Sequence, residues 1–124
     1  MGQLKPFRPT ALVVEDDPIQ REMIALLLEA TDYDVIQCED AETAELALKN
    51  RRAALLITDV SLVGEMTGIE LVARARELNP ALRVIVMSGR TLAGELPEGV
   101  TFFSKPFYPI ELIRELSSGN GRRH

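Results

Sequence analysis

The sequence predicts an α/β domain in which a five-stranded parallel sheet lies between two layers of helices. Short apolar runs alternate with segments of helical periodicity along the whole chain, and parallel strands need such crossover segments between them. The length of 124 residues fits one domain. An apolar fraction of 46% and a charged fraction of 27% are typical of an ordinary globular protein. We therefore expect a doubly wound fold with one continuous sheet.

Five short apolar runs predict the strands. They are Thr10–Val14, Asp34–Cys38, Ala54–Thr58, Arg83–Met87 and Thr101–Ser104. The first run has no polar alternation, which is typical of a strand buried on both faces. Cys38, the only cysteine, is expected to be a small buried apolar residue of the second strand.

Segments of helical periodicity follow most of these strands. Asp17 is expected to cap the first helix, with Pro18 in its first turn. We predict that the buried stripe of this helix consists of Ile19, Met23, Leu26, Leu27 and Ala30. Ala41–Asn50 offers an apolar face made of Ala44, Leu46, Ala47 and Leu48, and further helices are expected at Ile69–Leu78 and Tyr108–Leu116.

Composition excludes several classes of function. The net charge of −5, from 14 basic and 19 acidic residues, argues against binding of nucleic acid or anionic membranes. A single cysteine cannot form an intramolecular disulfide, and no apolar run approaches the ~18 residues of a membrane span, so we expect a cytoplasmic location. The only histidine, His124, is the last residue, which argues against histidine-centred catalysis and against a zinc site.

Polar residues follow four of the five predicted strands. Glu15 and Asp16 follow the first, Asp59 the third, Ser88 the fourth and Lys105 the fifth. Because ligands of such sheets bind at the carboxyl ends of the strands, we expect these side chains to meet at one edge. Each of these residues has an ordinary alternative role, as a helix cap, a turn or a surface charge, but the combination points to one site.

Three carboxylates at one edge would repel one another by roughly 3 kcal/mol per pair at about 5 Å and an effective dielectric near 20. Mg²⁺, which prefers oxygen ligands and keeps several waters, would offset this repulsion. A metal ion, a lysine and a hydroxyl together form a charge pattern suited to a phosphoryl group. Asp59 would be the nucleophile, because a carboxylate can form an acyl phosphate.

Four motifs resemble the receiver domain of two-component response regulators. They are Val13-Val-Glu-Asp-Asp-Pro18, Ile57-Thr-Asp59, Val86-Met-Ser-Gly89 and Phe103-Ser-Lys-Pro-Phe107. The resemblance covers about Thr10 to Leu116. It implies a flavodoxin-like fold with strand order 2-1-3-4-5.

The resemblance also implies a role for each matching residue. Asp59 matches the phosphorylated aspartate, and Asp16 and Glu15 match the acids that hold Mg²⁺ directly and through water. Ser61 matches the position whose backbone carbonyl completes the metal ligands. Lys105 matches the lysine that pairs with the phosphoryl group.

The remaining implied roles concern switching and timing. Ser88 matches the hydroxyl that turns toward the phosphoryl group, and Phe102 falls at the aromatic switch position. Arg90 and Ser61 fall where the family tunes the lifetime of the phosphorylated state. The bond between Lys105 and Pro106 is commonly cis in the family.

Two departures from the family pattern stand out. The loop 61–68 has Val63 at the usual proline and is one residue longer. Only 17 positions separate Ser88 from Lys105, and the segment 90–99 contains two glycines and Pro97. Because both residue types disfavour helix, we expect the fourth helix of the family to be short or irregular.

We therefore predict a stand-alone receiver domain at 10–117, with an N-terminal extension at 1–9 and a disordered tail at 118–124. It would accept a phosphoryl group from a sensor histidine kinase or a histidine phosphotransfer protein, lose it by self-catalysed hydrolysis, and act on a protein target, with a homodimer as one open form of assembly. It would not be an enzyme with a separate substrate. Two alternatives remain open: an interaction module with a vestigial site, and a phosphatase with an aspartyl nucleophile.

Overall fold

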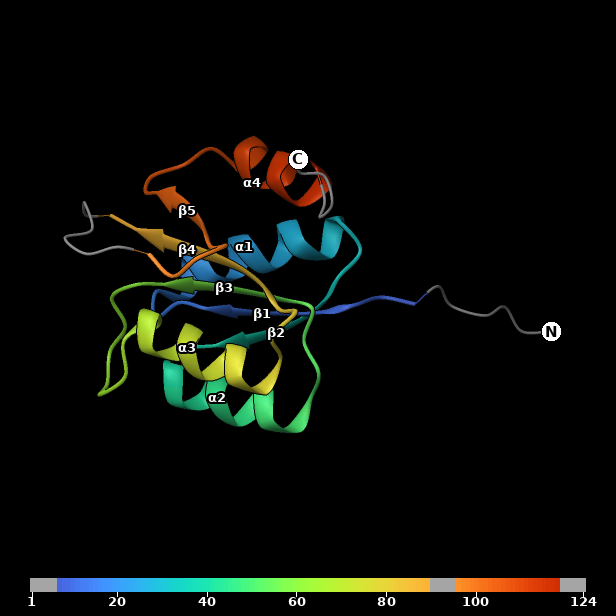
Figure 1. The fold of residues 1–124 in the computed structure, drawn as a ribbon. Coiled ribbons are helices and arrows are strands. Elements are labelled where there is room, and N and C mark those ends of the chain that lie inside the picture. Colours follow the sequence, from blue (N-terminus) through green and yellow to red (C-terminus); the bar gives the residue numbers. More distant parts are fainter. Residues whose placement is uncertain (1–6, 90–95, 119–124) are drawn as a thin grey trace.

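The computed structural model describes residues 7–89 and 96–118, which form one parallel sheet with helices on both faces (Figure 1). The strands are β1 (Thr10–Val14), β2 (Asp34–Cys38), β3 (Leu55–Asp59), β4 (Arg83–Ser88) and β5 (Thr101–Ser104). All four strand pairings are parallel, and the strand order is β2-β1-β3-β4-β5. The predicted strand order and the parallel sheet are confirmed.

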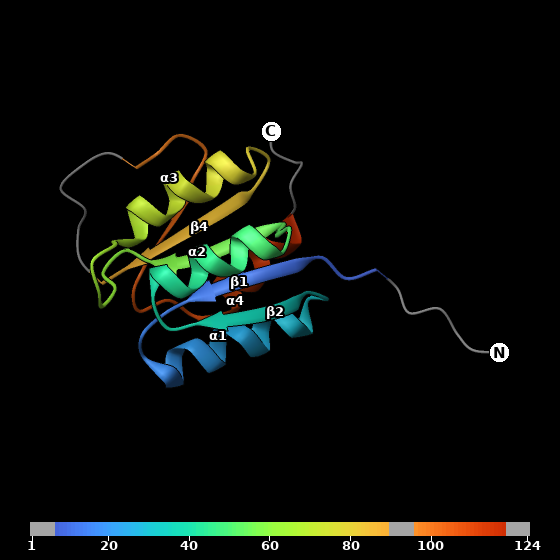
Figure 2. The same ribbon diagram turned by 90° about the horizontal axis from the view of Figure 1, so that it is seen from below.

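Two pairs of helices enclose the sheet. The helices are α1 (Pro18–Ala30), α2 (Ala41–Asn50), α3 (Gly68–Leu78) and α4 (Pro109–Ser118). The helices α1 and α4 cover one face, and α2 and α3 lie side by side over the other (Figures 1 and 2). None of the helices among the described residues is long and apolar enough to cross a membrane.

The core consists of two apolar layers, one on each face of the sheet. Leu12 and Val14 of β1 pack in the layer beneath α2 and α3, whereas Ala11 and Val13 pack in the layer beneath α1 and α4. Every residue of β1 is buried, which confirms the prediction of a strand buried on both faces. Cys38 is also buried, with 2% of its surface exposed.

The predicted buried stripe of the first helix is wrong. Ile19 is 80% exposed and Leu26 56% exposed, whereas Ile24, Ala25 and Leu28 are buried against the sheet. The remaining members of that stripe, Met23, Leu27 and Ala30, are exposed or half-buried. The helix carries apolar residues on two stripes, so periodicity alone did not identify the inner one; the small Ala25 belongs to the stripe that packs on the sheet.

A similar correction applies to α2. Ala44 and Leu48 are buried as predicted, together with Ala41, whereas Leu46 is 62% exposed. Leu46 lies about 200° around the helix from Ala44 at 3.6 residues per turn, so the two side chains cannot share one narrow face.

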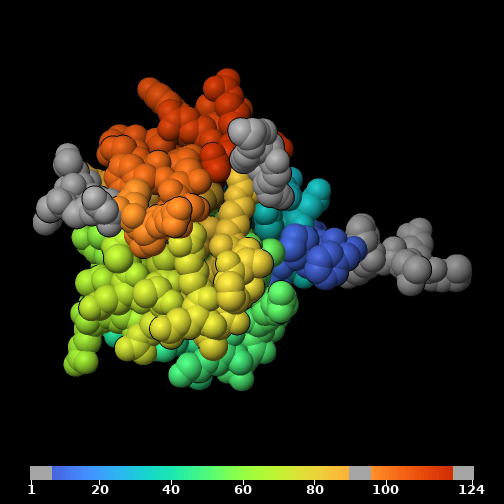
Figure 3. All heavy atoms as spheres, viewed as in Figure 1, coloured from blue at the N-terminus to red at the C-terminus, as the bar shows by residue number. Residues whose placement is uncertain are grey.

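The described part of the connection from β4 to β5 lies on the same face of the sheet as α3. Residues 90–95 lie outside the described residues; 96–100 form no helix, and Leu96 and Val100 pack against the core beneath α2 and α3. Arg76 of α3 donates a hydrogen bond to the Glu98 carbonyl at 2.5 Å. In the space-filling view, the orange atoms of this connection lie against the yellow atoms of α3 (Figure 3). The described part of the connection is therefore irregular.

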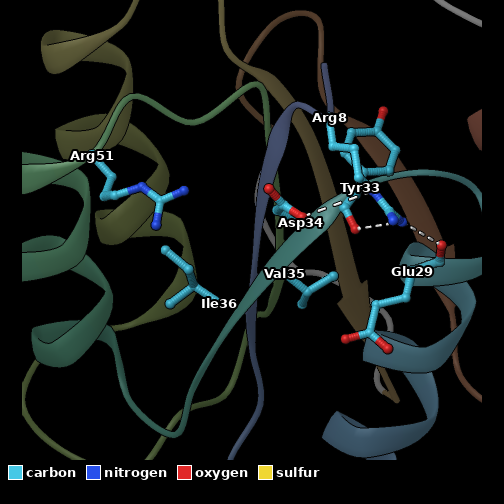
Figure 4. Close-up of a pocket in the computed structure, with 7 residues that line it drawn as sticks. All are labelled: Arg8, Glu29, Tyr33, Asp34, Val35, Ile36 and Arg51. Atoms are coloured by element: carbon cyan, nitrogen blue, oxygen red, sulfur yellow. Dashed lines mark hydrogen bonds and ion pairs between the residues drawn. The ribbon is translucent and has the colours of Figure 1, made fainter. Parts of the chain in front are cut away.

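The amino-terminal edge of the sheet borders a surface hollow of about 530 Å³, shown in Figure 4. On one side, the Arg8 guanidinium donates to the carbonyl oxygens of Glu29 at 3.0 Å and Tyr33 at 3.4 Å. Its other neighbour is the Asp34 carboxylate at 3.8 Å. Arg8 therefore links the segment just before β1 to the end of α1 and the start of β2. Its positive charge near the carboxyl end of α1 also interacts favourably with the helix dipole.

Candidate functional site

A buried ion pair network lies at the carboxyl ends of the strands. The ammonium of Lys105, which follows β5, bonds the Glu15 carboxylate at 2.8 Å and also the Asp59 carboxylate. Glu15 is 2% exposed and Asp59 7% exposed. Because an unpaired buried carboxylate is costly, one lysine stabilises two acids that would otherwise repel each other.

The pKa values of this network reflect its burial. Loss of solvent raises the pKa of Glu15, although the hydrogen bond from Lys105 works against that shift. Burial by itself would lower the pKa of Lys105, but the hydrogen bonds to Asp59 and Glu15 outweigh it and raise that pKa. The lysine is therefore held as a cation between the two acids.

The turn after β1 fixes Glu15 through its backbone and its side chain. Its N–H donates to the Cys38 carbonyl at 3.1 Å, and its Oε2 accepts the N–H of Asp17 at 3.1 Å. Arg21 of α1 donates to the Glu15 carbonyl at 2.8 Å. The sequence does not indicate this role of Arg21, since nothing in its spacing distinguishes it from a surface arginine.

Close packing fixes Asp59 at the end of β3. Its Oδ1 accepts the N–H of Ser61 at 2.9 Å. Gly68, the first residue of α3, lies so close that an added Cβ would stand 2.0 Å from the Asp59 carbonyl oxygen. The carbonyl of Val60, which follows Asp59 in the chain, accepts the N–H of Gly68 at 3.0 Å. Only glycine fits at the start of α3, because any side chain there would overlap with the Asp59 carbonyl.

The other predicted site residues differ in how the structure relates them to this network. Ser88 ends β4, is 2% exposed, and its carbonyl accepts the N–H of Lys105 at 2.8 Å. Asp16 follows Glu15 and is exposed. Phe102 stands on β5 opposite Val86 and is 36% exposed. The bond between Lys105 and Pro106 is cis. Arg90 lies outside the described residues.

The donor chemistry of the site fits a hard divalent cation. Carboxylate oxygens of Glu15 and Asp59 already converge on one cation, the Lys105 ammonium, and the exposed Asp16 follows directly in the chain. Within residues 7–89 and 96–118, no three acidic, histidine or cysteine side chains are already arranged to hold a metal. A metal ion would therefore share its acidic ligands with Lys105.

A parallel 2-1-3-4-5 sheet with buried acids and a lysine at its carboxyl edge defines a class of α/β signalling domain. The family model of the response regulator receiver domain matches residues 11–117. The chain belongs to this family of receiver domains of two-component systems.

Curated relatives include single-domain and longer regulators. The chain is 31% identical over 110 residues to the response regulator receiver protein CpdR of Brucella abortus, covering 85% of this chain and 91% of CpdR. It is 28% identical to the probable transcriptional regulatory protein TcrX of Mycobacterium tuberculosis, over 86% of this chain but only 47% of TcrX. The chain thus spans about half the length of the latter relative.

Solved structures agree on the fold. The receiver domain of the hybrid histidine kinase CckA is 31% identical, with a TM-score of 0.77 over 88% of this chain and 96% of that one. The receiver domain of the sensor histidine kinase PA1611 of Pseudomonas aeruginosa, solved with a magnesium ion in its active site cleft, is 21% identical with a TM-score of 0.75, over 90% of this chain and 96% of that one. The flavodoxin-like fold predicted from the motifs is confirmed.

Proposed function

We propose that this receiver domain accepts a phosphoryl group on Asp59 from the phosphohistidine of a sensor kinase or phosphotransfer protein. The observation that carries the proposal is the Lys105 ammonium bonded to both Glu15 and Asp59. It places a fixed positive charge beside the carboxylate, where negative charge builds up during phosphoryl transfer.

In the transfer, an Asp59 carboxylate oxygen forms a bond to phosphorus while the phosphorus–nitrogen bond to histidine breaks. The N–H of Ser61 holds Asp59 Oδ1 in place, and Lys105 pairs with the negative oxygens of the incoming group. Ser88 directly follows Met87, the register partner of Asp59 on the neighbouring strand, and would supply a hydroxyl to the phosphoryl group. Mg²⁺ held by Glu15, Asp16, Asp59 and the Ser61 carbonyl would neutralise the remaining phosphoryl charge; the PA1611 receiver domain binds Mg²⁺ in its cleft.

Hydrolysis of the acyl phosphate by water would return the domain to its resting state, with the same charges stabilising the transition state. The signal would pass to a protein partner through the changed surface. The net charge of −5 gives no support to a direct contact with nucleic acid.

The test is incubation with acetyl phosphate and Mg²⁺ followed by intact mass measurement. We expect the wild-type chain to gain one phosphoryl group and Asp59→Asn to gain none, because the amide is a much weaker nucleophile than the carboxylate. Asp34→Asn makes the same chemical change at the opposite edge of the sheet and should be phosphorylated normally. A wild-type chain that gains no mass would support the alternative of a vestigial site.

A further inference from the structure

The loop from β3 to α3, residues 60–67, controls the surroundings of Asp59. Its Ser61 donates to the Asp59 carboxylate. Both ends of the loop are fixed: Val60 bonds Gly68, and a capping box between Thr67 and Glu70 starts α3. The middle of the loop has no strand or helix of its own. Ser61 directly follows Val60 and leads into this middle part, so contacts further along the loop bear on how firmly Ser61 is placed.

A carboxylate from α2 contacts the second half of the loop. Glu42 Oε2 accepts the N–H of Met66 at 3.1 Å. Gly64 has a φ of +112°, and an added Cβ there would stand 3.0 Å from Glu42 Oε1. The Glu42 carboxylate thus bonds the loop at Met66 and lies close to Gly64, where an added Cβ would make it shift by a few tenths of an ångström.

Glu42 lies at the well-capped start of α2. It lies in the first turn of α2, where a negative charge favours the helix dipole. The helix is capped by Asp40, whose side chain accepts the N–H of Thr43 at 2.8 Å. Position 42 is therefore well suited to act as an anchor for a loop that starts in another part of the sequence.

We propose that Glu42 is a positioning residue for the phosphoryl-transfer site, holding the loop 60–67 so that Ser61 stays in place beside Asp59. The inference rests on the proposed function and adds a residue that none of the site motifs contains. Its physical basis is that displacements of an ångström in reacting groups cost large factors in rate. Glu42 does not touch Asp59; it acts through the loop.

The test compares Glu42→Ala with Glu42→Gln, which retains an acceptor oxygen. Glu45→Ala is the matched control, because Glu45 lies one turn further along α2 and bonds Arg74 at 2.9 Å instead of the loop. Two readouts are measured: amide hydrogen exchange of Ser61 and Met66 in metal-free protein, and the rates of phosphoryl uptake from acetyl phosphate and of its loss.

We expect Glu42→Ala to speed the exchange of both amides and to slow both phosphoryl rates by about threefold to tenfold, the range that corresponds to one lost hydrogen bond. The exchange and phosphoryl rates of Glu42→Gln should stay within about twofold of those of wild type, and the rates of Glu45→Ala should equal those of wild type. Wild-type rates in Glu42→Ala, or equal slowing in Glu42→Gln or Glu45→Ala, would overturn the inference. If the wild-type chain takes up no phosphoryl group, the proposed function fails, and amide exchange alone decides whether Glu42 places Ser61.

Discussion

Because the Cys38 thiol is buried, we expect the free energy of unfolding to fall as the pH becomes alkaline. Cys38 is 2% exposed, and loss of solvent raises its pKa to about 11 from an ordinary value of 9.0. Between these two pH values the unfolded chain has lost the proton that the folded chain keeps, so the free energy of unfolding falls as pH rises. The loss should approach about 2 to 3 kcal/mol near the upper value.

Urea unfolding of wild type and Cys38→Ala over this pH range checks the expectation. Other groups titrate there as well, so the difference between the two proteins is the relevant quantity. We expect this difference to change with pH in the direction given above. A difference that is independent of pH would mean that the thiol titrates normally in the folded protein.

Gly68 is the residue where the start of α3 and the end of β3 come closest. An added Cβ would meet the Asp59 carbonyl at 2.0 Å, which the backbone can relieve only by moving. We expect Gly68→Ala to lower the free energy of unfolding by about 2 to 4 kcal/mol, as overpacking against backbone does. Gly89→Ala is the control, because an added Cβ at Gly89 meets nothing within 4 Å. Equal unfolding free energies for the two variants in urea would contradict this packing argument.

Single residues differ in how much of their role the sequence reveals. Asp59 and Lys105 could be proposed as a pair because each directly follows a recognisable strand, and parallel strands bring their ends together. Arg21 and Glu42 could not, because their contacts with the Glu15 carbonyl and with Met66 depend on side-chain directions that emerge only when helices pack on the sheet. Residues at strand ends are predictable, whereas helix residues that support them are not.

At the scale of elements, starts and stops were easier to predict than buried faces. Asp17 accepts the N–H of Ile19 at 3.0 Å and caps α1 as predicted. The prediction of the buried face of α1 was wrong because the exposed Ile19 and Leu26 are as apolar as Ile24 and Leu28, which are buried. Local hydrogen bonds decide where a helix begins, but only the sheet decides which of two apolar stripes it covers.

The connection from β4 to β5 illustrates the same limit. Pro97 and its neighbouring glycines indicated poor helix formation, and the described part of this connection is irregular. What the sequence could not provide is its anchor: Arg76 of α3 bonds the Glu98 carbonyl, and Gly99 adopts a φ of +78° beside the Arg76 guanidinium. An irregular crossover thus depends on a side chain of the helix beneath it.

For the whole molecule, the decisive electrostatic feature is a cation shared by two buried acids. Lys105 joins the ends of β1, β3 and β5 through Glu15 and Asp59. If it were absent, the two carboxylates would repel each other by roughly 3 kcal/mol at about 5 Å and an effective dielectric near 20. A bound Mg²⁺ ion could take over this role, which makes metal binding and the lysine competitors for the same oxygens.

We therefore predict that Lys105→Met lowers the melting temperature in metal-free buffer and that Mg²⁺ raises it more in this variant than in wild type. A ligand at a hundredfold its dissociation constant stabilises the folded state by about 2.7 kcal/mol, and removing a competing cation lowers that constant. Thermal unfolding with and without millimolar Mg²⁺ measures both effects. The control is Lys49→Met, since Lys49 is an exposed lysine paired only loosely with Glu45 at 3.9 Å.

The control variant should melt within about 2 °C of wild type under both conditions, because exposed ion pairs contribute little. A Lys105→Met protein whose response to Mg²⁺ equals that of wild type would show that the metal and the lysine do not compete for the acids. A second contradicting result would be a Lys105→Met protein with the melting temperature of wild type in metal-free buffer. It would mean that Glu15 and Asp59 need no neutralising charge, and the electrostatic basis of the proposed phosphoryl site would be lost.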